Sequence, residues 1–143
     1  MRSGLWNFES SRPSMREQDL YLEQIDRFHF LPVAHHSYEF TLAAATAFKS
    51  LQPAAVAVEY PAQFQQLILR GIARLPKISV LMYGQRIRNF IRIEPVDPFV
   101  EVLRLAQENH IPSHCIDLTL GDYPPVFDPL PDSYAISRIG HRA

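Results

Sequence analysis

The chain has 143 residues, of which 47% are hydrophobic and 20% are charged, and its formal net charge is −1 at pH 7. A chain of this length can bury the core of one globular domain, and its near-neutral charge argues against a general nucleic-acid binder. No apolar stretch is long enough to span a membrane, and the N-terminal residues lack the apolar core of a signal peptide. We therefore expect a cytoplasmic protein that does not enter a membrane.

Four apolar runs alternate with three amphipathic runs along the chain. Strands are expected at 28–34, 54–60, 77–84 and 111–118, with a short additional strand within 90–94, and helices are expected at 38–51, 62–75 and 98–110. Ser37 fits the N-cap of the first helix, and Pro61 fits the first turn of the second. This order predicts an α/β fold with a mainly parallel sheet, helices on both faces and right-handed βαβ units.

The chain divides into three segments by composition. Residues 1–26 are polar and form a lead-in segment, residues 27–120 form the α/β core domain, and residues 121–143 form a Pro-rich C-terminal extension. Four prolines between 124 and 131 exclude a central strand there. Cys115 is the only cysteine, so no internal disulfide can form, and we expect it to be a small buried side chain in a strand.

Polar or titratable side chains stand where each predicted strand ends. They are His35 and His36, Glu59 and Tyr60, Tyr83, and Asp117. Ligands of open α/β sheets bind outside the carboxyl ends of the strands, and neighbouring strands lie about 4.8 Å apart. We therefore expect His35 to meet Glu59 in one crevice, with Asp117 close by. Since successive strand residues face opposite ways, His35 and His36 are not expected to do the same job.

A His–Glu pair at this edge has several uses. Glu59 can hold one His tautomer and make the imidazole a general base. His35 and Glu59 can instead ligate a divalent metal such as Mn²⁺, Co²⁺ or Zn²⁺ that activates water. A third alternative makes Glu59 the base and the imidazole an electrostatic stabiliser. The simplest alternative is a hydrogen bond that only satisfies two polar groups at the edge of a sheet.

A basic run lies between Tyr60 and Ile93, where no acidic residue occurs. Its members are Arg70, Arg74, Lys77, Arg86, Arg88 and Arg92. Such a run is either a solvated face or a surface for an anion or an acidic partner.

Four segments of the chain resemble an uncharacterised bacterial family. They are LPVAHHS, LQPAAVAVEYPAQF, LPKISVLMY and VEVLRLAQENHIPSHCIDL, and the family carries L-P-V-R-H-H-S, a strand ending V-E-G-P, an A-x-R-x-A helix and an I-D-L strand. More distantly, the chain is similar to the superfamily of TraB, PrgY, GumN and TIKI proteins, the erythromycin esterases and the ChaN-like haem-binding lipoproteins. Their pattern is G-T-x-H-x-S, followed about a helix later by P-D-V-V-x-V-E. The resemblance runs from about residue 30 to residue 118.

The resemblance implies a set of site residues. His35 matches the superfamily His, Glu59 matches the strand-end Glu, and Arg104 and Asp117 match the later Arg and Asp. With the adjacent His36, these residues form the implied catalytic set, and His35 and Glu59 are the implied metal ligands. TIKI-like members imply a metal-dependent protease. The erythromycin esterases imply a His/Glu hydrolase without an obvious metal.

Three positions depart from the family pattern: Pro32 stands for Gly, Ala34 for Arg, and Tyr60 for Gly. Most relatives are longer, so a truncated or degenerate copy without activity is one expectation. The first functional hypothesis is a hydrolase of this superfamily, with or without a divalent metal. The alternative is a non-catalytic binding or adaptor module, because family members often sit beside MoxR-type AAA+ ATPase and von Willebrand A proteins. A third hypothesis is a ChaN-like haem or metal binder that uses a histidine and Tyr83.

Overall fold

The computed structural model describes residues 22–84 and 88–118. Its elements in chain order are β1 (Glu23–Ile25), β2 (Phe28–Phe30), α1 (Tyr38–Leu51), β3 (Val56–Pro61), the 3-10 helix η2 (Ala62–Phe64), α2 (Gln65–Ile72), β4 (Ser79–Tyr83), β5 (Asn89–Ile93), α3 (Pro98–Glu108) and β6 (Ser113–Asp117). Most of the expected lead-in, 1–26, and the whole Pro-rich extension, 121–143, lie outside the described residues. The predictions about those two segments therefore stay predictions.

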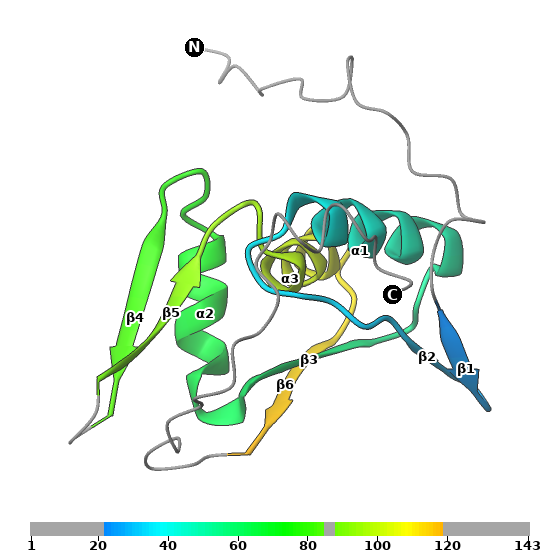
Figure 1. Ribbon diagram of the computed structural model, residues 1–143, viewed down its shortest axis with the longest axis horizontal. Helices are drawn as coiled ribbons and strands as arrows, with labels where there is room; N and C mark the ends of the chain where they lie inside the picture. Colours follow the sequence, from blue (N-terminus) through cyan, green and yellow to red (C-terminus); the bar gives the residue numbers. More distant parts are fainter. Residues whose placement is uncertain (1–21, 85–87, 119–143) are drawn as a thin grey trace.

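The described strands form three two-stranded sheets. β1–β2 and β4–β5 are antiparallel hairpins, and β3–β6 is a parallel pair. Figure 1 shows the two hairpins at opposite ends of the molecule, with β3–β6 between them. The fold is thus mixed α/β with a small parallel sheet, where a mainly parallel sheet was expected. β5 follows β4 after only residues 84–88, which is too short for the crossover that a parallel strand needs.

The structure corrects the first predicted strand, 28–34. β2 ends at Phe30 and pairs with β1, which lies inside the segment expected as lead-in. Its side chains are exposed rather than buried, with Phe28 56% and Phe30 51% exposed. Pro32 has no N–H to offer a sheet, and residues 31–36 continue to α1 without strand pairing. His35 and His36 therefore lie in a connecting segment rather than at the end of a strand.

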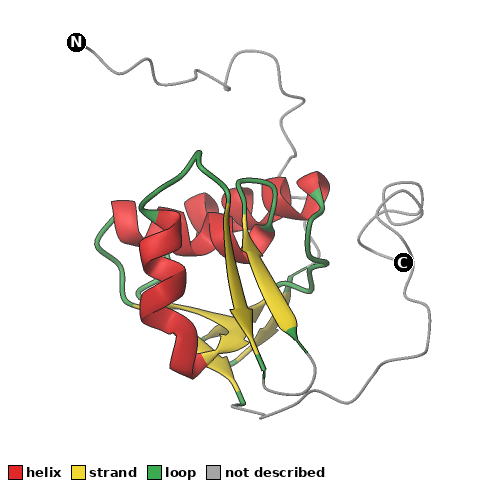
Figure 2. Cartoon of the chain, turned by 90° about the vertical axis from the view of Figure 1, so that its left-hand side faces the viewer, coloured by secondary structure: helices red, strands yellow, loops and turns green. Residues whose placement is uncertain are grey.

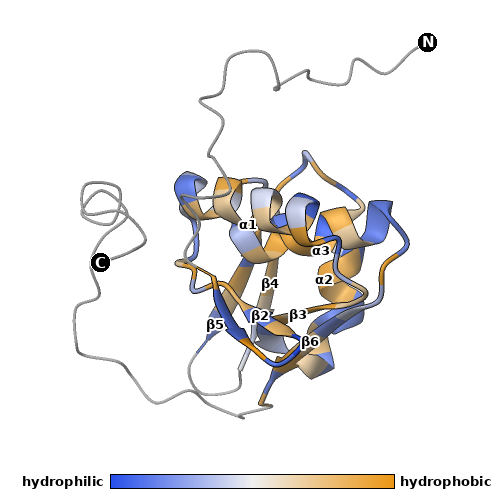
Figure 3. Cartoon of the chain, turned by 90° about the vertical axis from the view of Figure 1, so that its right-hand side faces the viewer, coloured by the Kyte–Doolittle hydropathy of each residue, from blue (hydrophilic) through white to orange (hydrophobic). Residues whose placement is uncertain are grey.

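The three described helices carry apolar stripes that pack on one another and on the strands. α1 has the predicted bounds, whereas α2 is shorter than 62–75 because the 3-10 turn η2 precedes it. Phe48 of α1 packs with Leu105 and Ala106 of α3. Figure 3 shows hydrophobic and hydrophilic segments alternating along α1 and α3, as expected of helices with one buried face. None of the described helices combines the length and apolar composition needed to cross a membrane.

The main core lies between α2, α3 and the strands. It contains Val58, Tyr60, Ile68, Ile72, Ile91, Ile93, Val100, Leu103 and Cys115. Figure 2 shows α2 standing alongside the β4–β5 hairpin, with α1 and α3 running across one end of the strands. The close approach of α2 to β5 depends on Gly71, because a β-carbon at that position would collide with the side chain of Ile93. Cys115 is 5% exposed, which confirms its predicted burial in a strand.

Candidate functional site

The carboxylate of Asp97 lies at the centre of the most extensive polar cluster in the described residues. Asp97 is the N-cap of α3, and Pro98 follows at the first helical position. Both residue types are favoured there, because aspartate accepts the free N–H groups of the first turn and proline has no N–H to leave unpaired. Oδ1 of Asp97 accepts hydrogen bonds from the backbone N–H groups of Phe99, at 3.0 Å, and Val100, at 3.2 Å.

Three further donors reach the same carboxylate from other parts of the chain. Nδ1 of His35 lies 2.7 Å from Oδ2, and the backbone N–H of His36 donates to Oδ2 at 3.3 Å. The hydroxyl of Tyr60, in β3, donates to Oδ1 at 3.1 Å. The Asp97 side chain is 0% exposed, and a buried charge requires such partners. Two segments distant in sequence are therefore joined to the start of α3.

The cluster keeps Asp97 ionised. Burial by itself would raise the pKa of the carboxyl, but the hydrogen bond and charge of His35, together with the N–H groups of Val100 and His36, lower the pKa of Asp97 below its ordinary value. Burial, and next the neighbouring Asp97 charge, raise the pKa of the Tyr60 hydroxyl. Tyr60 therefore remains a hydrogen-bond donor to an anionic partner throughout the neutral range.

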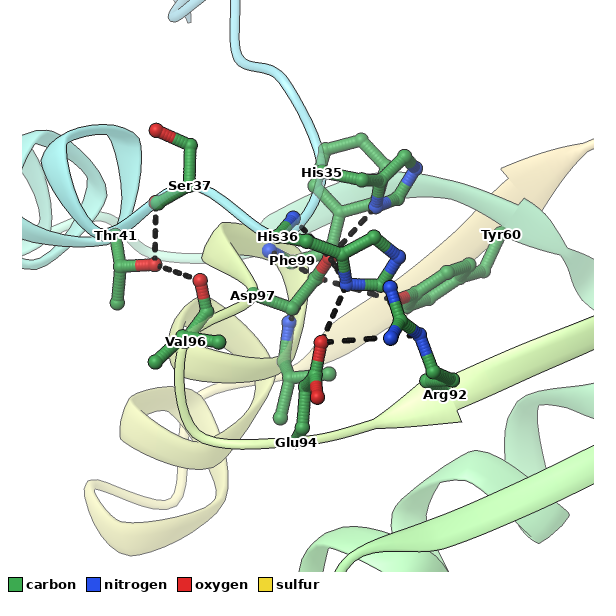
Figure 4. A network of polar contacts seen from close by, with 11 residues as sticks. His35, His36, Ser37, Thr41, Tyr60, Arg92, Glu94, Val96, Asp97 and Phe99 are labelled. Carbon is green, nitrogen blue, oxygen red and sulfur yellow. Dashed lines mark hydrogen bonds and ion pairs between the residues drawn. The ribbon is translucent and has the colours of Figure 1, made fainter. Parts of the chain in front are cut away.

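The His35 imidazole is held on one edge and open on the other. Its ring stacks on Tyr60, with ring centroids 5.7 Å apart, and meets Phe99 edge-on at 4.6 Å. Because Nδ1 faces an ionised carboxylate, the geometry assigns it a proton and leaves the lone pair on Nε2. Among the described residues Nε2 has no hydrogen-bond partner, and the side chain is 46% exposed. Figure 4 shows this cluster from close by.

His36 joins the same cluster because of its backbone conformation. Its φ of 57° lies in the left-handed region, so the alternation that would send two neighbouring side chains to opposite faces does not apply. Its Nδ1 lies 2.6 Å from Oε1 of Glu94, although the N–H direction is not aligned for a hydrogen bond. Nε of Arg92 lies 3.9 Å from the same oxygen. The His36 imidazole thus lies closest to Glu94, and its Nδ1 is also 3.8 Å from Oδ2 of Asp97, the oxygen that holds His35.

A short hydrogen-bonded link holds the histidine segment against the start of α3. The hydroxyl of Thr41, in the first turn of α1, contacts the carbonyl oxygens of Ser37 and Val96. Ser37 occupies the predicted N-cap position of α1, but its side chain makes no capping hydrogen bond. Packing of α1 on α3 therefore places His35 beside Asp97.

Glu59, the expected partner of His35, is exposed on β3. Its neighbour Tyr60 is buried and points into the core, so strand alternation turns Glu59 outward. No hydrogen bond or ion pair joins Glu59 to another residue within 22–84 and 88–118. Asp97, rather than Glu59, is the carboxylate that contacts His35. In the same residues, no group of three or more His, Cys, Asp or Glu side chains is placed to hold a metal ion.

Arg104 and Asp117, the other two predicted site residues, lie outside the Asp97 cluster. Arg104 faces outward on α3, where Glu101 binds its guanidinium through two hydrogen bonds of 2.8 Å and Glu108 through one of 2.6 Å. Asp117 ends β6 opposite Pro61 of β3. Burial raises the pKa of the Tyr83 hydroxyl, and the negative charge of Asp117 raises it further. The structure thus brings together His35 and His36 of the predicted set, and it adds Asp97, Glu94 and Arg92.

Comparisons of the chain with protein-family models, with curated proteins and with solved structures find no match.

Proposed function

We propose that the chain is a hydrolase in which His35, oriented by Asp97, acts as a general base toward water. The observation that carries the proposal is the 2.7 Å contact between His35 Nδ1 and a fully buried, ionised carboxylate, with Nε2 facing outward. Such a carboxylate fixes the tautomer and orientation of the imidazole, and it stabilises the imidazolium that forms when Nε2 takes a proton.

The surroundings of His35 support a positioned base rather than a freely rotating side chain. The rings of Tyr60 and Phe99 flank the imidazole on two sides. Phe99 N–H and Tyr60 O–H also anchor the carboxylate that holds it. The resemblance to the TraB and erythromycin-esterase superfamily points to the same reaction class. In this proposal Asp97 is a positioning residue that takes the role first given to Glu59, and a divalent metal would assist only through the open Nε2 side.

A panel of chromogenic esters tests this proposal. The wild-type chain is expected to release p-nitrophenol from at least one carboxylic or phosphate ester. His35→Gln is expected to lower kcat/KM by about 100-fold or more, the usual contribution of a general base. The control is His29→Gln, which changes an exposed histidine of β2. Turnover that is equal in His35→Gln and His29→Gln would reject the assignment.

A second candidate function, the adaptor module, is favoured by a different observation. The outer face of the β4–β5 hairpin exposes large apolar side chains, with Val80 56%, Met82 58% and Phe90 63% exposed. Apolar side chains grouped in this way often mark protein contacts. We propose as the alternative that this face binds a partner such as an AAA+ ATPase or a von Willebrand A protein. Replacing Met82 and Phe90 with serine should then abolish binding to a purified partner and leave ester hydrolysis unchanged.

A further inference from the structure

The exposed side of the cluster carries two imidazoles and one guanidinium. His35 and His36 lie with ring centroids 5.7 Å apart. Figure 4 shows the guanidinium of Arg92 beside the His36 imidazole. The side chains of His35, His36 and Arg92 are 46%, 34% and 44% exposed, so all three can reach a ligand arriving from solvent.

The carboxylates of the cluster lie behind these donors. Asp97 is 0% exposed and Glu94 is 13% exposed. Asp97 lies 2.7 Å from Nδ1 of His35 and 3.8 Å from Nδ1 of His36, and Glu94 lies 2.6 Å from Nδ1 of His36. Both Nε2 atoms are therefore left for a ligand. Arg92 is held only loosely, because its single ion pair within the described residues spans 3.9 Å. The part of the site that meets solvent therefore presents a guanidinium and two imidazole edges, while the carboxylates are already engaged.

The sequence around Arg92 adds positive charge. Arg92 closes the basic run between Tyr60 and Ile93, in which no acidic residue occurs. Arg88 is exposed near it, just before β5. Such a surface attracts anions before they bind.

We infer that the substrate class of this site is a phosphate ester, whose phosphoryl oxygens are bound by Arg92 and whose proton transfers are made by His35 and His36. This inference rests on the hydrolase proposal and gives it a substrate. A carboxylic ester is neutral until it is attacked, so it offers a guanidinium no charge to bind in the ground state. A phosphoryl group carries permanent negative charge and matches the planar fork of arginine. Two imidazoles, His35 held by Asp97 and His36 lying closest to Glu94, supply one base and one acid.

The proposed step balances as follows. His35 Nε2 takes a proton from water while the water oxygen forms a bond to phosphorus. The bond from phosphorus to the leaving oxygen breaks, and that oxygen takes a proton from Nε2 of His36, which starts the step as an imidazolium with its Nδ1 facing Glu94. Arg92 stays bound to the non-bridging oxygens throughout. After the alcohol and phosphate leave, His35 releases its proton to solvent and His36 takes one from solvent.

A binding experiment with inorganic phosphate tests the anion site without requiring turnover. Phosphate is titrated calorimetrically and in thermal melts, against sodium chloride at the same ionic strength. Wild type is expected to bind phosphate. Arg92→Gln is expected to raise the apparent Kd by about tenfold or more, because it removes a charge-assisted bidentate contact. Arg88→Gln is the matched control, since it removes the same charge from an exposed position just before the same strand and should retain the affinity.

Two binding results would overturn the inference. One is a wild-type chain that does not bind phosphate beyond the salt control. The other is equal loss in Arg92→Gln and Arg88→Gln, which would mean that only the general positive charge attracts the anion. Since Arg92 is partly exposed, its replacement should not unfold the chain, and the melt without phosphate verifies this directly.

An activity experiment separates this inference from the hydrolase proposal. Turnover of p-nitrophenyl phosphate or bis-p-nitrophenyl phosphate that requires His35, with a raised KM in Arg92→Gln, is the expected result. Turnover of p-nitrophenyl acetate alone would overturn the phosphate inference and leave the hydrolase. Phosphate binding through Arg92 with no turnover of any ester would instead overturn the hydrolase and, with it, the assignment of a phosphate-ester substrate.

Discussion

Replacing Asp97 with asparagine tests whether one carboxylate organises the whole site. Asparagine keeps the shape and one carbonyl oxygen but puts an NH₂ group where the second carboxylate oxygen stood. With the carbonyl at the Oδ1 position, the bonds from Tyr60, Phe99 and Val100 are retained. The new NH₂ then faces two donors, His35 Nδ1 and the backbone N–H of His36.

The expected cost follows from these two contacts. A hydrogen bond to a charged group contributes about 1.5–3 kcal/mol and a neutral one about 0.5–1.5 kcal/mol, so about 1 kcal/mol is lost at His35 even if its ring changes tautomer. A part-buried N–H left unpaired at His36 costs about 1–3 kcal/mol. Together these costs lower the free energy of unfolding by about 2–4 kcal/mol. A typical domain has a free energy of unfolding of only about 5–15 kcal/mol, so this is a large part of it.

Urea unfolding followed by circular dichroism measures this cost as a lower midpoint at an unchanged m-value. The matched control is Glu59→Gln, which makes the same chemical change at an exposed carboxylate and should stay within about 0.5 kcal/mol of wild type. The ¹⁵N shifts of His35 should report a change of tautomer in Asp97→Asn only. If Asp97→Asn were as stable as Glu59→Gln, the central role assigned to Asp97 would be wrong.

Three further predictions concern pH, the arginine of α3 and metal ions. Burial raises the pKa of Asp97, but the hydrogen bond and charge of His35 outweigh it, so the pKa is lowered in the folded state. The ionised Asp97 therefore stabilises the fold above the unfolded pKa of about 3.9. This stabilisation is lost as the pH falls through the folded pKa. Urea melts between pH 6 and pH 2 should show a shallower acid loss in Asp97→Asn than in wild type, and parallel curves would contradict this. Arg104→Gln should cost about 1 kcal/mol or less, because its ion pairs lie at the surface, and should leave ester hydrolysis unchanged; a large loss of kcat would support the catalytic role implied by the resemblance. Any rise in Tm caused by Mn²⁺, Co²⁺ or Zn²⁺ should disappear in His35→Ala and persist in Glu59→Gln, and loss of the rise in Glu59→Gln would restore the His35/Glu59 ligand pair.

The sequence predicted the helices better than the sheet. The apolar stripe of residues 38–51 identified α1 with its observed bounds, because helical periodicity is a local property of the chain. The partner of a strand is set by distant contacts, so the pairing of β4 with β5 was visible only in the shortness of residues 84–88. The strand expected at 28–34 failed for a related reason: its apolar residues suggested burial, but no described element covers Phe28 and Phe30.

The sequence predicted the two histidines of the site but not the carboxylate that they contact. His35 and His36 stood out as paired titratable residues next to a helix start. The Asp-Pro pair at 97–98 signals an N-cap followed by proline at the first helical position, so the position of Asp97 could have been recognised. Its contact with His35 could not, because the two residues are separated by 62 positions and meet only when α1 packs on α3.

The left-handed backbone at His36 means that substitutions that stabilise the fold there would remove a side chain of the proposed site. A side chain other than glycine in that conformation costs about 1–2 kcal/mol, and the chain carries this cost at φ 57°. A library screened only for thermal tolerance should therefore enrich His36→Gly and His36→Asn, since both residues relax the backbone. Those sturdier clones would have discarded the imidazole that faces Glu94. Selection for heat resistance and selection for turnover should consequently diverge at this single codon.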